Sequence, residues 1–137
     1  MTGFTRILCP TDFSEPARDA LAWAAEFARS FGGKIDIVHV CALHEDGPVE
    51  AEAEMETAVP AEYDDVVLSK RIVRALSADL GILNEARSGN ADLIVMGTHG
   101  RSRMKHVLLG SVAERVVQLS HCPVLTVRPS GHTFERP

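Results

Sequence analysis

Short apolar strand patterns alternate with helical patterns along most of this chain. Strand patterns occupy residues 6–10, 35–40, 91–96 and 123–128, with a further outer strand expected within 66–76. Helical patterns, in which apolar residues recur every three or four positions, occupy residues 14–31, 77–86 and 111–120. Such alternation builds a parallel sheet with helices on both faces. The sequence therefore predicts one doubly wound α/β domain.

Composition narrows the class of protein. A chain of 137 residues with 45% apolar content suits one domain with a modest core, so residues 1–137 are expected to fold together. The chain has no run of about 20 apolar residues and no signal-like amino terminus, so we expect a cytoplasmic protein that does not enter membranes. A formal charge of -5 disfavours nucleic acid as a partner. The three cysteines, Cys9, Cys41 and Cys122, are expected to be buried thiols rather than a disulfide framework, although Cys9 and Cys41 could be neighbours on adjacent strands.

The segment 43–65 is strongly acidic, and no lysine or arginine occurs between Ile35 and Ser69. From Glu50 to Glu56, glutamates alternate with alanine or methionine, and we find no helical apolar stripe there. We expect a variable, solvated excursion or one short helix, in preference to a lid or a metal-attracting loop. Residues 129–137 are expected to form a loose tail.

The segment after 91–96 contains the residues most suited to bind an anion. It reads Gly97-Thr-His-Gly100 and, nine residues later, Gly110-Ser111 before a helix. Glycines let backbone amides approach a phosphate closely, and the first amides of a helix are unpaired and partly positive. A structural alternative is that Ser111 and Glu114 form a capping box. The basic residues that follow Gly100 add positive potential, although such a run is more often a solvated face; they are Arg101, Arg103, Lys105 and His106.

These motifs resemble those of the ATP-binding members of the universal stress protein family. Their signature is glycine, two residues, glycine, nine residues, glycine, then serine or threonine, and this chain matches every fixed position. The resemblance extends over Ile7-Leu-Cys-Pro-Thr-Asp-Phe-Ser14, Ala91-Asp-Leu-Ile-Val-Met-Gly97, Gly110-Ser-Val-Ala-Glu-Arg115 and Cys122-Pro-Val-Leu-Thr-Val127. It implies a Rossmann-like fold of the adenine nucleotide α-hydrolase type, with a five-stranded parallel sheet in the order 3-2-1-4-5.

The resemblance also implies a site for ATP or a related nucleotide such as ADP or AMP, with Mg²⁺ or Mn²⁺ able to accompany the phosphates. The residues expected to hold the phosphates are Gly97, Gly100, Gly110 and Ser111. Asp12 and Val40 would face the ribose and adenine, with Pro10, Thr11 and Met96 lining the pocket. Arg101 and Val112, beside the motif, complete the expected site.

Asp12 is the side chain most worth testing. A carboxylate at a strand end can accept hydrogen bonds from a sugar hydroxyl or an exocyclic amine, and open α/β sheets bind ligands at the carboxyl ends of their strands. The alternative is an aspartate that serves only the turn or the helix start. Between Val40 and Ala91 the chain is shorter than is usual for the family, which could leave one side of the pocket open to water.

Catalytic signatures are weak. Gly32-Gly-Lys34 lacks the spacing and hydroxyl residue of a phosphate-binding P-loop, and no nucleophile elbow is present. Structural packing is favoured over a metal site for His39, Cys41 and His44. No catalytic residue or metal ligand is therefore assigned, and slow ATP hydrolysis is the most that is expected.

Two functions of different classes follow. The first is a stress-response signalling or regulatory module that binds an adenine nucleotide. The second is a nucleotide-independent dimeric interaction protein whose glycines serve loop packing. For both, residues Pro123 to Arg128 are expected to pair with the same strand of a second copy, because they form an unprotected sheet edge.

Overall fold

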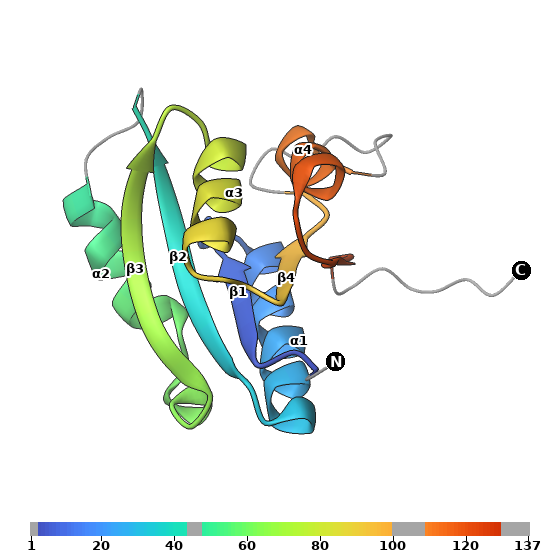
Figure 1. Ribbon diagram of the computed structural model, residues 1–137. Coiled ribbons are helices and arrows are strands. Elements are labelled where there is room, and N and C mark those ends of the chain that lie inside the picture. Colours follow the sequence, from blue (N-terminus) through green and yellow to red (C-terminus); the bar gives the residue numbers. More distant parts are fainter. Residues whose placement is uncertain (1–2, 44–47, 100–108, 130–137) are drawn as a thin grey trace, which may run out of the picture.

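The computed structural model describes residues 3–43, 48–99 and 109–129. They form an open five-stranded sheet with helices on both faces (Figure 1). The strands are β1 (Arg6–Pro10), β2 (Lys34–Ala42), β3 (Val67–Ala75), β4 (Leu93–Gly97) and β5 (Val124–Val127). The helices are α1 (Glu15–Phe31), α2 (Pro48–Ala58), α3 (Ala78–Ser88) and α4 (Ser111–Leu119), with a short 3-10 helix, η1 (Ala61–Tyr63). Neighbouring strands are parallel throughout, in the order β3-β2-β1-β4-β5. The predicted fold and strand order are confirmed.

Successive strand residues divide between two hydrophobic clusters, one on each face of the sheet. On β1, Ile7 and Cys9 join the cluster that contains the buried residues of α1 and α2, whereas Leu8 joins the cluster that contains those of α3 and α4. Figure 1 shows the same division, with α3 and α4 in front of the sheet and α1 and α2 behind it. Strands β1 and β4, in the middle of the sheet, are largely apolar on both faces because both faces are covered.

Helix α1 begins and ends where the sequence predicts. Ser14 caps its start, since the Ser14 hydroxyl accepts a hydrogen bond from the Ala17 amide at 3.3 Å. Pro16 lies in the first turn, where its missing N–H costs nothing. Gly32 ends the helix in the left-handed conformation, with φ of 69°.

Helix α2 corrects one expectation about the acidic segment. Its buried residues Ala51 and Met55, followed by Val59, are spaced by four positions and pack against the α1 side of the sheet. The expectation that no helical apolar stripe exists here was wrong, and the short-helix alternative is what the structure contains. The glutamates between these residues are exposed and concealed the stripe by alternating with small residues.

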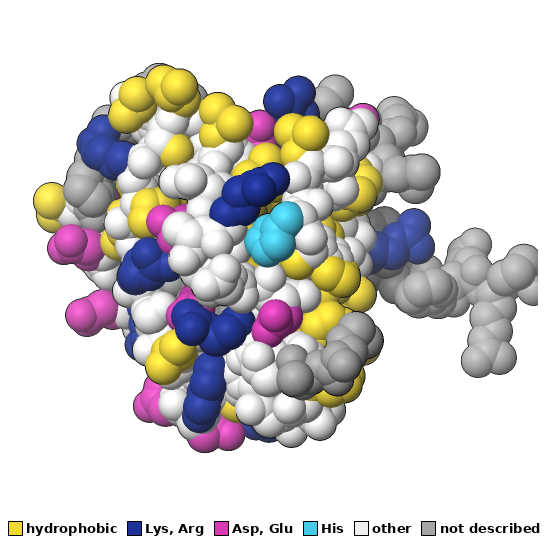
Figure 2. Space-filling view, in the orientation of Figure 1, with side chains coloured by type: hydrophobic (Ala, Val, Ile, Leu, Met, Phe, Trp, Pro, Cys, Tyr) yellow, Lys and Arg dark blue, Asp and Glu magenta, His cyan; other side chains and the backbone are white. Residues whose placement is uncertain are grey.

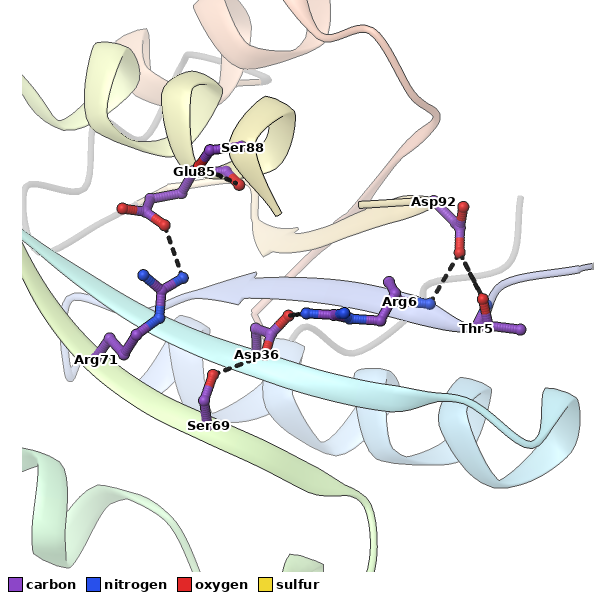
Figure 3. A network of polar contacts seen from close by, with 8 residues as sticks. All are labelled: Thr5, Arg6, Asp36, Ser69, Arg71, Glu85, Ser88 and Asp92. Carbon is purple, nitrogen blue, oxygen red and sulfur yellow. Dashed lines mark hydrogen bonds and ion pairs between the residues drawn. The ribbon is translucent and has the colours of Figure 1, made fainter. Parts of the chain in front are cut away.

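Polar contacts tie the strands together near their amino ends (Figure 3). The Asp92 carboxylate accepts hydrogen bonds from the Thr5 amide at 3.2 Å, the Thr5 hydroxyl at 2.9 Å and the Arg6 amide at 2.9 Å. These bonds, led by that of the Arg6 amide, lower the pKa of Asp92. The buried Asp36 carboxylate accepts from Arg6 Nη2 at 2.8 Å and from Ser69 Oγ at 2.7 Å. At this end of the sheet, the Asp92 and Asp36 carboxylates are therefore satisfied by hydrogen bonds within the protein.

The strand register separates the first two cysteines. Cys9 lies opposite Ile37, and Cys41 lies further along β2, opposite Arg74 of β3. The suggestion that the two cysteines are neighbours was wrong. Complete burial raises the pKa of the Cys9 thiol to about 12, so this thiol is not a reactive group.

Candidate functional site

The candidate site lies at the carboxyl ends of the strands, where β1 and β4 are adjacent. From β1 the chain builds outward to β2 and β3 on one side, and it returns to place β4 and β5 on the other. The loops after β1 and β4 therefore diverge to opposite faces, which opens a crevice in folds of this type. Helix α4 begins at the same end of the sheet, after the segment that follows β4.

The two ends of the segment between β4 and α4 are bonded together. The Gly110 amide donates to the Thr98 carbonyl at 2.7 Å, and the Thr98 amide donates to the Val127 carbonyl at 3.0 Å. Both glycines are tightly packed: a Cβ on Gly97 would lie 3.2 Å from Pro16 Cβ, and one on Gly110 would lie 3.3 Å from the Thr98 carbonyl oxygen. Gly97 and Gly110 therefore have a packing role, and the Gly110 amide already donates a hydrogen bond within the protein.

The first amides of α4 have no hydrogen-bond partner within the helix. Gly110 is the N-cap residue, and the first intrahelical bond runs from the Glu114 amide to the Gly110 carbonyl at 2.9 Å. The amides of Ser111, Val112 and Ala113 precede that bond and so have no partner within the helix. Ser111 is the first helical residue and is exposed. The capping-box alternative was wrong, because it requires Ser111 at the cap position that Gly110 occupies.

The loop between β1 and α1 holds the Asp12 carboxylate at the end of β1. Asp12 Oδ1 accepts hydrogen bonds from the Ser14 amide at 3.0 Å and from the Ser14 hydroxyl. Ser14 in turn caps α1, so Asp12 takes part in the turn that starts the helix. The structure thus contains the turn contacts of the alternative interpretation, and contact between Asp12 and a nucleotide stays a prediction.

Three other residues predicted to line the pocket are buried in the core at this end of the sheet. Pro10, Val40 and Met96 are all buried. The Val40 side chain packs beneath α3, where a Cβ on Gly81 would lie only 2.6 Å from Val40 Cγ1. Because the Val38 carbonyl accepts from the Thr11 amide at 2.8 Å, the peptide groups of Val40, two residues on, also point toward the β1 side. The backbone of Val40, and not its side chain, therefore faces the β1 side.

Several predicted residues lie outside the part of the chain that the structure describes. Gly100 and Arg101 do so, together with Arg103, Lys105, His106 and His44. Of the predicted residues that are described, Thr11 and Asp12 directly follow β1, Gly97 ends β4, and Val112 is half-buried in the first turn of α4. Within residues 3–43, 48–99 and 109–129, no three His, Cys, Asp or Glu side chains are grouped closely enough to hold a metal ion.

Four residues at this end of the sheet were not predicted as site residues. Thr98 is buried, and its hydroxyl lies 3.1 Å from His99 Nδ1. Phe13 stacks on His39 with ring centroids 4.4 Å apart, so His39 packs as expected. Thr98 and His99 lie inside the glycine motif, which is the only sequence signal that marks them. The contact between Phe13 and His39 joins separate elements and leaves no local pattern.

The surface beside the site is mixed in character. Figure 2 shows positive and negative side chains intermingled on the face formed by α3 and α4, with hydrophobic side chains near its top. Exposed leucines follow the ends of β2 and β3 and lie in the first turn of α3; they are Leu43, Leu76 and Leu80. Among the described helices, none combines the length and apolar character needed to cross a bilayer.

Comparison with known proteins identifies the family. The model of the universal stress protein family matches residues 3–128, and this chain therefore belongs to that family. Universal stress protein MJ0531 of Methanocaldococcus jannaschii is 32% identical, over 91% of this chain and 82% of its own length. A universal stress protein of Thermus aquaticus is 34% identical, over 91% of this chain and 99% of its own length.

Solved structures agree with the fold. The structure of protein MJ0577 of Methanocaldococcus jannaschii superposes with a TM-score of 0.79 at 33% identity, over 91% of this chain and 96% of that chain. A universal stress protein in complex with cAMP gives a TM-score of 0.74 at 22% identity, over 93% of this chain and 99% of that chain. One from Archaeoglobus fulgidus in complex with dAMP gives 0.69 at 22% identity, over 92% of this chain and 98% of that chain. At this identity the last two support the fold alone.

Proposed function

We propose that this universal stress protein binds ATP or a related adenine nucleotide and acts as a cytoplasmic stress-response regulatory module. The observation that carries the proposal is the bond between the Gly110 amide and the Thr98 carbonyl, 2.7 Å long. It fixes the start of α4 beside the end of β4, so the first-turn amides lie at the carboxyl end of the sheet, the end at which Asp12 follows β1. A helix N-terminus in this position favours the binding of phosphate.

The sugar and base would be held on the β1 side of the crevice. There the loop from Thr11 to Ser14 holds the Asp12 carboxylate, and the peptide groups of Val40 point toward the same side. Two relatives of the same fold are described in complex with cAMP and dAMP, so adenine nucleotides are the class to test first. Gly100 and Arg101 would complete the phosphate side, and Mg²⁺ or Mn²⁺ would accompany the phosphates.

Ser111→Glu gives a sharp test. A carboxylate at this exposed position would repel a polyphosphate, yet it suits the positive end of a helix and should leave the fold intact. We expect ATP affinity, measured by isothermal titration calorimetry with Mg²⁺, to fall at least about tenfold, the equivalent of about 1.4 kcal/mol.

Two controls separate charge from shape and position. Ser111→Gln adds a side chain of similar size without charge and should reduce affinity less. Gln118→Glu adds the same charge at an exposed position near the other end of α4 and should leave affinity unchanged. Equal affinity in the wild type and Ser111→Glu would refute the proposed phosphate position.

A second candidate, a nucleotide-independent interaction protein, is favoured by the tight packing of Gly97 and Gly110. In that case the glycine motif would serve only to close the segment between β4 and α4. Failure of the wild type to bind any purine nucleotide at millimolar concentration would leave this candidate alone.

We also propose a homodimer formed through Pro123 to Arg128. Strand β5 ends the sheet order. The carbonyl of Pro123, just before β5, accepts from the Ile94 amide of β4, and the Val127 carbonyl accepts from the Thr98 amide just after β4. By strand alternation, the Thr126 N–H points away from β4. Thr126→Pro should therefore block pairing at the outer edge while sparing the bonds to β4, and Thr126→Val is the matched control. Sedimentation velocity should show a dimer for the wild type and for Thr126→Val, and a monomer for Thr126→Pro; a wild type that is monomeric at every concentration would refute the dimer.

A further inference from the structure

The loop after β1 contains a buried residue in an unfavourable backbone conformation. Phe13 has a φ of 66°, in the left-handed region. Residues other than glycine, asparagine and aspartate adopt this conformation only at an energetic cost. Its side chain is 6% exposed, so the ring is fixed inside the protein. Such strain persists only where surrounding contacts determine the conformation, and it is concentrated at functional sites.

One side chain of β2, that of His39, contacts this loop at two points. The His39 ring stacks on the Phe13 ring, with centroids 4.4 Å apart and planes inclined by 30°. His39 Nδ1 lies 2.7 Å from the Thr11 carbonyl oxygen. Because a carbonyl can only accept, Nδ1 must carry the hydrogen in this bond.

Backbone bonds explain why His39 has this partner. The Thr11 amide still donates to the Val38 carbonyl at 2.8 Å, as in a continued β1–β2 pairing. The next bond of that pairing would join the Thr11 carbonyl to the Val40 amide. In its place, His39 Nδ1 donates to the Thr11 carbonyl, and the Phe13 amide donates to Thr11 Oγ1 at 3.0 Å. The chain thus leaves the sheet at the point where Asp12 is presented.

We propose that His39 and Phe13 are positioning residues that hold the Thr11–Ser14 loop ready for the nucleotide. The ring stack fixes the left-handed residue, and the bond from Nδ1 fixes the carbonyl before Asp12. The part of this proposal that concerns nucleotide affinity rests on the proposed function. The part that concerns the loop does not, because it can be measured without ligand.

Two substitutions of His39 separate its contacts. His39→Phe keeps an aromatic ring against Phe13 and removes the donor, whereas His39→Asn keeps an N–H donor near the position of Nδ1 and removes the ring. The control is His121→Asn, at an exposed histidine between α4 and β5. Amide hydrogen exchange of Phe13 and Ser14 is measured by NMR in the free protein, and the Kd for ATP by calorimetry.

In both His39 variants we expect these two amides to exchange about fivefold to tenfold faster and the Kd for ATP to rise by a similar factor. His121→Asn should change neither. Unchanged exchange in both His39 variants would overturn the proposal, as would faster exchange with an unchanged Kd in a wild type that binds ATP. If the wild type binds no nucleotide, the proposed function fails. The exchange measurement still decides whether His39 and Phe13 hold the loop: faster exchange in the His39 variants supports it, and unchanged exchange overturns it.

Discussion

Replacing Gly81 with alanine should destabilise this protein even though alanine is the better helix former. A Cβ at this position of α3 would lie 2.6 Å from Val40 Cγ1, 2.8 Å from Val40 Cγ2 and 3.1 Å from Ala75 Cβ. Ordinary contacts between carbon atoms are about 3.5–4.0 Å, so α3 would have to retreat from the sheet by about 1 Å. Both neighbours belong to strands and cannot move aside as a flexible side chain would.

Two opposing terms set the size of the effect. Alanine gains about 1 kcal/mol of helix propensity over glycine. Overpacking a dense core costs about 1–3 kcal/mol, and contacts this short favour the upper end. We therefore expect Gly81→Ala to lower the free energy of unfolding by about 2 kcal/mol.

Urea unfolding followed by circular dichroism measures this change. For a slope of about 2 kcal/mol/M, the midpoint should fall by about 1 M. Asn84→Ala, at an exposed position of the same helix, should be neutral or slightly stabilising. Val40→Ala removes the methyl groups that a Cβ would strike, so combining it with Gly81→Ala should cost at least about 1 kcal/mol less than the sum of the two single changes. A Gly81→Ala protein as stable as the wild type, or additive single changes, would refute the reasoning.

Three further predictions concern other parts of the molecule. The pKa of Asp92 is lowered chiefly by the Arg6 amide. The contribution of the Asp92 carboxylate to stability is therefore complete above its unfolded pKa of about 3.9 and is lost as the pH falls through the lower folded pKa. Asp92→Asn should make the free energy of unfolding, measured by urea titration, fall less steeply as the pH is lowered. Phe13→Gly should be more stable than Phe13→Ala by about 1 kcal/mol in urea unfolding, because glycine tolerates a φ of 66°; the reverse order would contradict the strain. The half-buried Cys122 should react with a thiol reagent at pH 8 in the folded protein, whereas Cys9, whose pKa burial raises to about 12, should react only after unfolding; equal rates would show that the core opens readily.

The sequence predicted the elements whose signals are local. Helix α1 has a serine cap, a proline in its first turn and a terminal glycine, and the structure contains all three. Alternating strand and helix patterns were enough to predict the parallel sheet, because helices on both faces require strands such as β1 and β4 to be largely apolar.

The errors arose where a local pattern was ambiguous. The stripe at α2 consists of Ala51 and Met55 in the helix and Val59 just after it. Exposed glutamates separate these residues, so the alternation of glutamates with small residues concealed a spacing of four. At α4, a shift of one residue decides whether Ser111 or Gly110 is the cap, and serine is the usual choice on propensity alone. The tertiary bond from the Gly110 amide to the Thr98 carbonyl fixes the position of the helix start.

The candidate site was only partly predictable for a related reason. The motif from Gly97 to Ser111 is local and could be read directly. The stack of His39 on Phe13 depends on the register of β2 against β1, and the contact of Gly81 with Val40 depends on where α3 crosses the sheet. Such contacts between distant segments leave no periodic signal in the sequence.

On the proposed function, the first-turn amides of α4 receive the phosphates of an adenine nucleotide. Titration of the ¹⁵N-labelled protein with ATP and Mg²⁺, followed by NMR, tests it most directly. The amide signals of Ser111, Val112 and Ala113 should move in a saturable manner together with that of Asp12, and adenosine alone should leave the three helix signals in place. Binding that moves other amides while these three stay fixed would contradict the account.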